Sequence, residues 1–90
     1  MWHDIVKYTE IHRYYDGYPG EFIKEENIKE GLRFYFLTGP DKNVKEWYEV
    51  IEVEYDWSRQ SYKVAVWDEA KEKIRYISKL FIYVYGRVDD

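Results

Sequence analysis

The chain has 90 residues, the length of one small domain. Its formal net charge of −4 disfavours tight binding to duplex nucleic acid, which usually requires a basic surface. Cysteine is absent, which excludes disulfides, thiolate metal sites and cysteine nucleophiles. No apolar run approaches the roughly 18 residues of a membrane span. The N-terminus lacks the basic and apolar regions of a signal peptide, so we expect an intracellular protein with no membrane partner.

Aromatic residues dominate the composition, with eleven Tyr, four Trp and four Phe. A domain this small cannot bury so many rings, so some should lie in a binding surface or in a homodimer interface. Charged residues make up 36% of the chain, whereas there are only two Asn and one Gln. This balance is typical of thermophiles and predicts a thermophilic archaeon, a thermophilic bacterium or one of their viruses as the source. A melting temperature of about 50 °C, ordinary for a mesophile domain, would contradict that prediction.

The first 30 residues are expected to form an N-terminal extension, a hairpin lying over one end of a core at residues 31–88 of the single domain. In residues 4–15 the β-branched residues favour a strand, although the apolar spacing also fits a helix. A turn is expected at 16–20, where Gly and Pro supply the required backbone angles. Residues 25–31 are expected to form a single helical turn or a loop.

Five later runs rich in β-branched and aromatic residues predict strands at 32–37, 46–57, 61–67, 73–78 and 80–86. The second run alternates, which predicts that Trp47, Ile51 and Trp57 face inward. The last run is apolar on both faces and is therefore expected in the middle of the sheet. Residues 69–79 are open to two interpretations: a hairpin turn at 69–72 leading into a strand, which we favour, or a helix capped by Asp68.

These elements predict a mostly β fold, either a small SH3-like barrel or a curled antiparallel sheet with the N-terminal extension. A helix at about 69–79 would instead make the fold α+β. The chain shows no internal repeat or low-complexity linker.

Three carboxylates at every second position of the long strand form the acidic stripe, Glu52, Glu54 and Asp56, and Glu46 would extend it. Carboxylates at this spacing, about 6.6–6.8 Å apart, resemble a phosphate backbone and could bind a basic groove on a protein partner. The alternative is a solvated strand face on which Lys63 or Arg75 neutralises the carboxylates from neighbouring strands.

Exposed rings are the second candidate for partner binding. Tyr14, Tyr15 and Tyr18 flank the turn at 16–20, and tyrosines near Arg13 are typical of interface hot spots and of base-stacking surfaces. The alternative is that these rings pack over one end of the domain. Trp67 has the opposite parity to the apolar Val64 and Val66, so we expect it to be exposed and available for contact.

Catalytic signatures are missing from the chain. Phosphate-binding loops, dinucleotide fingerprints, zinc-protease motifs and nucleophile elbows are all absent, and His12 with Asp16 lacks the usual metal-ligand spacing. The sequence therefore predicts a protein that is not an enzyme and needs no cofactor or metal. We expect a small acidic interaction module, an accessory or inhibitory factor that docks a protein partner through exposed aromatics and the acidic stripe. The alternative is a single-stranded nucleic-acid-binding domain whose Tyr and Trp rings stack on bases, which the net charge disfavours.

Overall fold

A computed structural model describes residues 8, 11, 13 and 17–89 of the chain. In this part of the chain one antiparallel sheet has the strand order β1-β6-β2-β3-β4-β5. Its strands are β1 (Glu21–Phe22), β2 (Arg33–Thr38), β3 (Val44–Asp56), β4 (Ser61–Asp68), β5 (Lys73–Ser78) and β6 (Arg87–Val88). The helical elements are the 3-10 turn η3 (Glu25–Asn27) and the helix α1 (Lys79–Tyr85). Most of segment 4–15 lies outside the described residues, so its two interpretations stay open.

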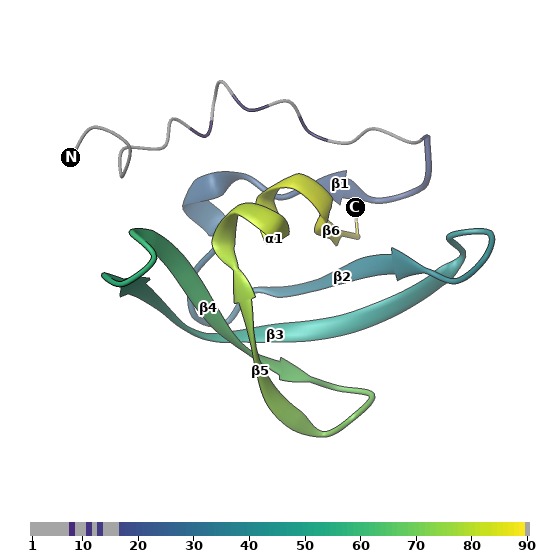
Figure 1. The fold of residues 1–90 in the computed structure, drawn as a ribbon. Helices are drawn as coiled ribbons and strands as arrows, with labels where there is room; N and C mark the ends of the chain where they lie inside the picture. Colours follow the sequence, from purple (N-terminus) through teal and green to yellow (C-terminus); the bar gives the residue numbers. More distant parts are fainter. Residues whose placement is uncertain (1–7, 9–10, 12, 14–16, 90) are drawn as a thin grey trace.

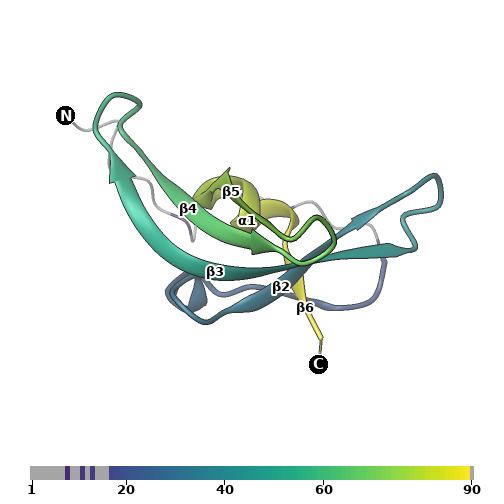
Figure 2. The same ribbon diagram turned by 90° about the horizontal axis from the view of Figure 1, so that it is seen from below.

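The sheet curls around α1 without closing into a barrel (Figures 1 and 2). The expected mostly β fold is thus confirmed in its curled-sheet form rather than as a closed SH3-like barrel. The short strand β1 pairs with β6 near the C-terminus, and the turn η3 follows β1, as expected for a helical turn in residues 25–31.

Residues 69–72 form a turn between β4 and β5, so the hairpin interpretation is confirmed and the helix at 69–79 does not form. The carboxylate of Asp68 holds this turn, because its Oδ1 atom accepts hydrogen bonds from the backbone N–H groups of Ala70 and Lys71, both at 3.2 Å. A side chain that closes a turn on the following N–H groups competes with helix formation.

The strand expected at 80–86 is wrong, because these residues lie mainly in α1. The hydroxyl of Ser78 caps the helix by accepting a hydrogen bond from the Phe81 N–H at 3.5 Å. Ile82 and Tyr83 are buried, whereas Leu80, Phe81 and Tyr85 are exposed, which is a helical period. A short run that is apolar throughout fits a buried strand and a helix equally well, and the sequence pattern alone could not separate them.

The inward orientation expected for Trp47, Ile51 and Trp57 is also wrong. A β-bulge lies between Val50 and Glu52, so Ile51 is an extra residue opposite β4 and the inward positions change from even to odd numbers. Trp47 therefore lies partly exposed on the outer face, and Trp57 falls in the turn after β3 with 79% of its surface exposed.

The core fills the hollow between α1 and the sheet. Buried Ile82 and Tyr83 of α1 pack with apolar side chains that share the concave face of the sheet or follow β1, namely Ile23, Ile28, Phe34, Tyr48, Val50, Val64 and Val66. The Lys79 ammonium at the start of α1 lies 2.7 Å from the Glu25 carboxylate of η3. This ion pair joins the helix to the segment that covers its other side.

Candidate interaction surfaces

The face of the sheet that points away from α1, here called the convex face, carries large apolar side chains. Four of them form the convex patch: Ile51 (39% exposed), Trp67 (40%), Ile74 (55%) and Tyr76 (63%). The strand register places Trp67 beside Ile74 and Tyr76 beside Ala65, so side chains of β4 and β5 share one surface. Large apolar side chains that are exposed together on one face are typical of interaction sites.

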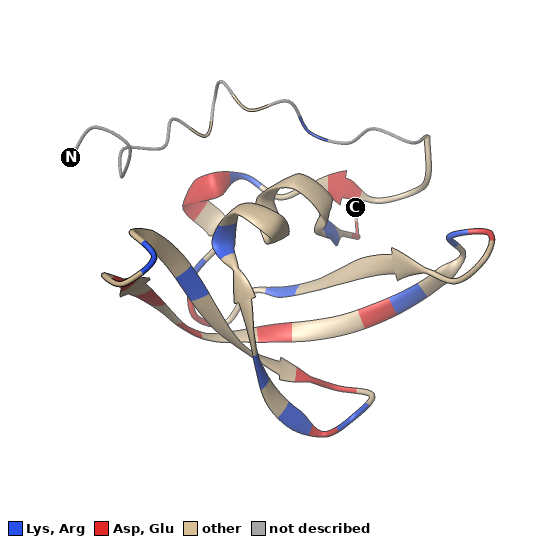
Figure 3. Ribbon diagram, viewed as in Figure 1, with Lys and Arg blue, Asp and Glu red and all other residues tan. Residues whose placement is uncertain are grey.

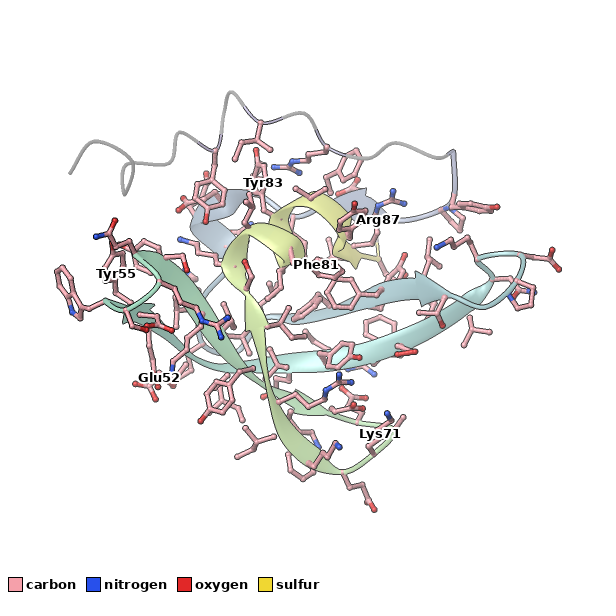
Figure 4. All side chains as sticks on the ribbon, in the orientation of Figure 1. Glu52, Tyr55, Lys71, Phe81, Tyr83 and Arg87 are labelled. Atoms are coloured by element: carbon pink, nitrogen blue, oxygen red, sulfur yellow. The ribbon has the colours of Figure 1, made fainter. Side chains whose placement is uncertain are left out.

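Carboxylates of β3 border the convex patch. Glu49 is the register partner of Trp67, and Glu52 is the partner of Ala65. Figure 3 shows Asp and Glu in red at several places along β3. Glu52 lies on the opposite side of β3 from Phe81 of α1 (Figure 4). Glu54 is the third carboxylate of this border. Among Glu49, Glu52 and Glu54, it alone forms an ion pair with a described cation, Lys63, at 3.6 Å. Arg33, the register partner of Glu49 on β2, interacts with Glu49 electrostatically, so the border charge that neither an ion pair nor this interaction offsets among the described residues is that of Glu52.

The acidic stripe differs from its expected form at both ends. Glu46 does not extend it, because the bulge places Glu46 on the concave face beside Phe36. Asp56 lies at the end of β3 and closes the following turn, where its Oδ1 accepts from the Ser58 hydroxyl at 2.6 Å. That hydrogen bond lowers the pKa of Asp56. The neutralisation expected from Lys63 is present at Glu54, whereas Arg75 instead contacts Asp68 at 3.3 Å.

The structure brings only some of the predicted contact residues together. Glu52, Glu54 and Trp67 share the convex face, and Trp67 is exposed as expected. Tyr18 is exposed but lies in the segment before β1, where its backbone oxygen accepts from Arg87 at 3.5 Å. Tyr14 and Tyr15 lie outside the described residues.

Four members of this surface were not predicted from the sequence: Glu49, Ile51, Ile74 and Tyr76. The alternation within residues 73–78 could have placed the last two on one face, because Ile74 and Tyr76 are two positions apart. The position of Glu49 and Ile51 on the convex face could not be predicted, because no sequence pattern indicates the bulge between Val50 and Glu52.

A groove on the concave side is the second candidate surface. It has a volume of about 460 Å³ and is called the β5 groove, lined by Phe36, Glu46, Tyr48, Arg75, Tyr76, Ile77, Ser78 and Phe81. The rings of Phe36 and Phe81 meet edge to face with centroids 5.1 Å apart. The Tyr48 hydroxyl donates to the Glu46 carboxylate at 3.3 Å. Burial, followed by the charge of Glu46, raises the pKa of Tyr48, so this phenol stays protonated and remains a donor.

The described residues include no group of three or more His, Cys, Asp or Glu side chains that could hold a metal ion. No helix in this part of the chain is long and apolar enough to cross a membrane. Comparison with known proteins gives no match: no family model, curated protein or solved structure is significantly similar to this chain.

Proposed function

We propose that this protein is an interaction module that binds a protein partner through the convex patch and its acidic border. The observation that carries the proposal is the exposure of Trp67 and Tyr76 side by side with Ile74 on a face that no described element covers. Tyr and Trp are enriched at binding hot spots because they bury much area with few rotatable bonds. The origin in a thermophile or its virus, and a role as an accessory or inhibitory factor, belong to the same proposal.

The border of the patch defines the chemistry of the partner. Glu52 forms no ion pair among the described residues, whereas Glu49 faces Arg33 on β2, so a partner with a Lys or Arg opposite Glu52 and an apolar centre complements this face. Such a rim of charge mainly affects the association rate and its salt dependence, whereas the rings contribute most of the affinity.

A selection from a random-peptide phage library on the immobilised protein tests this proposal. We expect enriched peptides to combine basic and apolar residues and to quench tryptophan fluorescence. The double variant Trp67→Ser/Tyr76→Ser should lose at least tenfold in affinity for them, because each ring is a hot-spot candidate. The matched control is Leu80→Ser, which removes an equally exposed apolar side chain from α1.

Charge reversal tests the acidic border separately. Glu52→Lys should weaken the selected peptides and reduce the salt dependence of binding, whereas Glu30→Lys makes the same change in charge at an exposed site outside the sheet. Equal effects of the two reversals would show that only net charge matters. Peptides that bind every variant equally would overturn the convex patch as the binding surface.

Base stacking on Trp67 and Tyr76 is the second candidate function, since both rings are exposed on a sheet. The acidic border opposes it, because Glu49 and Glu52 would repel phosphates. We therefore expect no quenching on titration with a thymidine oligonucleotide at low salt. Saturable, salt-sensitive quenching that is lost in Trp67→Ser would favour the nucleic-acid function instead. A concentration-dependent dimer in analytical ultracentrifugation, lost in Tyr76→Ser, would identify the patch as a homodimer interface.

A further inference from the structure

The β5 groove runs along the free edge of the sheet. Four consecutive residues of β5, from Arg75 to Ser78, line it. Consecutive strand residues point to opposite faces, so they can line one groove only if the groove follows the edge of the strand. β5 is the last strand in the sheet order and pairs only with β4 among the described residues. Its outer N–H and C=O groups are of the kind to which another strand can add.

The opposite wall of the groove is aromatic and contains a carboxylate. Glu46 is the direct register partner of Phe36, so the two side chains lie together on the concave face. Phe81 packs against Phe36 from α1, and nearly half of its surface remains exposed. Figure 4 shows Phe81 between α1 and the sheet. An extended segment along β5 would place alternate side chains against this wall.

The charge of Glu46 determines which side chain fits there. The Glu46 carboxylate is partly buried and receives one neutral hydrogen bond, from Tyr48, while no described cation lies within ion-pair distance of it. Arg75, the cation on the β5 side, is engaged by Asp68. Lys42 and Arg87 line the adjoining pocket, which shares Phe36, Glu46 and Phe81 with the β5 groove, but neither forms an ion pair with Glu46. A carboxylate next to aromatic faces is complementary to an alkylammonium or guanidinium group.

We propose that the β5 groove binds an extended segment of a protein partner, which adds to β5 as a seventh strand and lays a Lys or Arg side chain across the Phe36 and Phe81 rings toward Glu46. The aliphatic stem of that side chain packs on the rings, and its head group meets the carboxylate. Backbone hydrogen bonds to β5 supply affinity that does not depend on sequence, and the Glu46 pocket supplies selectivity. This inference rests on the proposed function as an interaction module and adds a second surface, which runs along the edge of the sheet and meets the convex patch at Tyr76.

The test uses three capped heptapeptides of alternating Thr and Val that differ only in the central residue: lysine, norleucine or glutamate. Amide spectra of the ¹⁵N-labelled protein are recorded during titration with each peptide. We expect the lysine peptide to shift the amides of residues 73–78 and to slow their hydrogen exchange, because these groups gain strand partners. The norleucine peptide should bind about tenfold more weakly and the glutamate peptide more weakly still.

Glu46→Gln should reduce the preference for lysine over norleucine to about twofold, while leaving the weaker binding of norleucine unchanged. Glu49→Gln is the matched control, since it makes the same change on the opposite face of the same strand and should retain the preference. Equal binding of the lysine and norleucine peptides, or a preference that survives Glu46→Gln, would overturn the cation pocket. Absence of any shift at residues 73–78 would overturn strand addition.

The result also separates this inference from the proposed function. Shifts confined to Ile51 and Trp67 of the convex patch, with none at residues 73–78, would overturn the β5 groove and leave the interaction module intact. Conversely, Trp67→Ser should bind the lysine peptide as the unmodified protein does, because Trp67 lies on the convex face and does not line the β5 groove. If the phage selection fails but the lysine peptide binds the groove, the convex patch is rejected as a binding surface and the β5 groove is supported.

Discussion

The two halves of the convex face contain similar aromatic side chains in different surroundings. In the half formed by β2 and the start of β3, Tyr35 is fully buried and its ring lies 4.8 Å from that of Trp47. The Arg33 guanidinium covers Trp47 at 3.9 Å. In the half formed by β4 and β5, Trp67 and Tyr76 are exposed, and the only cation near Tyr76 among the described residues is Lys63, at 5.2 Å.

The covered half shows how this chain shields an aromatic sheet face. The segment before β1 passes over Tyr35, whose hydroxyl donates to the Pro19 carbonyl at 3.3 Å. Arg33 is fixed over Trp47 by two hydrogen bonds to Glu69, at 2.8 and 2.9 Å, and these lower the pKa of Glu69. The convex face of this sheet can therefore shield aromatic rings, as it does for Tyr35 and Trp47. The exposure of Trp67 and Tyr76 is not a necessary consequence of their position on a sheet. This contrast is the reason to regard the uncovered half as a contact surface.

Truncation of one ring in each half should produce the largest difference. We expect Tyr35→Ala to lower the free energy of unfolding by about 3–5 kcal/mol, because it leaves a cavity under the segment before β1. Tyr76→Ala should change it by about 0.5 kcal/mol or less, as for most exposed sites. Urea unfolding followed by fluorescence measures both values. Similar losses from the two variants would remove the distinction between the halves.

The approach of the chain to Tyr35 depends on Gly20, which has a φ of +101°. A Cβ atom there would collide with the Tyr35 hydroxyl. We expect Gly20→Ala to cost more than the roughly 1–3 kcal/mol of an unfavourable backbone region alone. Gly31→Ala is the control, since its φ is +95° but its Cβ would meet no atom within 4 Å.

Tyr35→Phe should recover part of the loss in Gly20→Ala, because it removes the atom that collides. The four proteins form a double-mutant cycle, measured by urea unfolding. Equal costs for Gly20→Ala and Gly31→Ala, together with additive effects in the cycle, would show that the close approach contributes nothing.

The turn beside the uncovered half depends on Asp68. Burial acts to raise the pKa of Asp68, but the hydrogen bonds from Lys71, Arg75 and Ala70 outweigh it and lower the pKa overall. A folded-state pKa below that of the unfolded chain stabilises the fold above the unfolded value of about 3.9, and this stabilisation is lost as pH falls through the folded value. We therefore expect Asp68→Asn to lower the melting temperature at pH 7 by about 5 °C.

The difference between Asp68→Asn and the unmodified protein should shrink as the pH falls from about 5 to about 2, because the unmodified carboxylate also becomes neutral there. Calorimetric melting curves at several pH values measure it. The exposed Asp41→Asn is the control and should change little at any pH. A difference that stays constant with pH would mean that Asp68 acts through shape rather than charge.

The sequence predicted those features that depend on local alternation and turn residues. The strands at 61–67 and 73–78 and the exposure of Trp67 follow from period-two patterns, whereas Asp68 fits both the hairpin turn and the cap of the alternative helix. The helix α1 could not be recognised, because Leu80 to Tyr85 is apolar throughout and only the capping hydroxyl of Ser78 distinguishes a helix start.

The sequence predicted only part of the convex patch, because a β-bulge in β3 changes which residues face outward. A bulge adds one residue to one strand, and the resulting exchange of faces depends on the pairing partner rather than on the residues at the bulge. This one irregularity places Ile51 on the outside, Tyr48 in the core and Glu46 in the β5 groove. The long-range packing of Phe81 on Phe36 was equally invisible, since it joins segments that are far apart in the chain.

The smallest predicted effect concerns Lys63, the single cation of the uncovered half that pairs with its acidic border. Its exposed ion pair with Glu54 should contribute no more than about 0.2–1 kcal/mol, so Lys63→Gln should barely change unfolding in urea. The same substitution releases the charge of Glu54 and makes the border of the convex patch more negative. Peptides selected on that patch should therefore bind the variant about twofold to threefold more tightly at low salt, with the gain lost at high salt. Weaker binding by Lys63→Gln would mean that the partner contacts this ammonium group directly and that acidic residues belong in the bound segment.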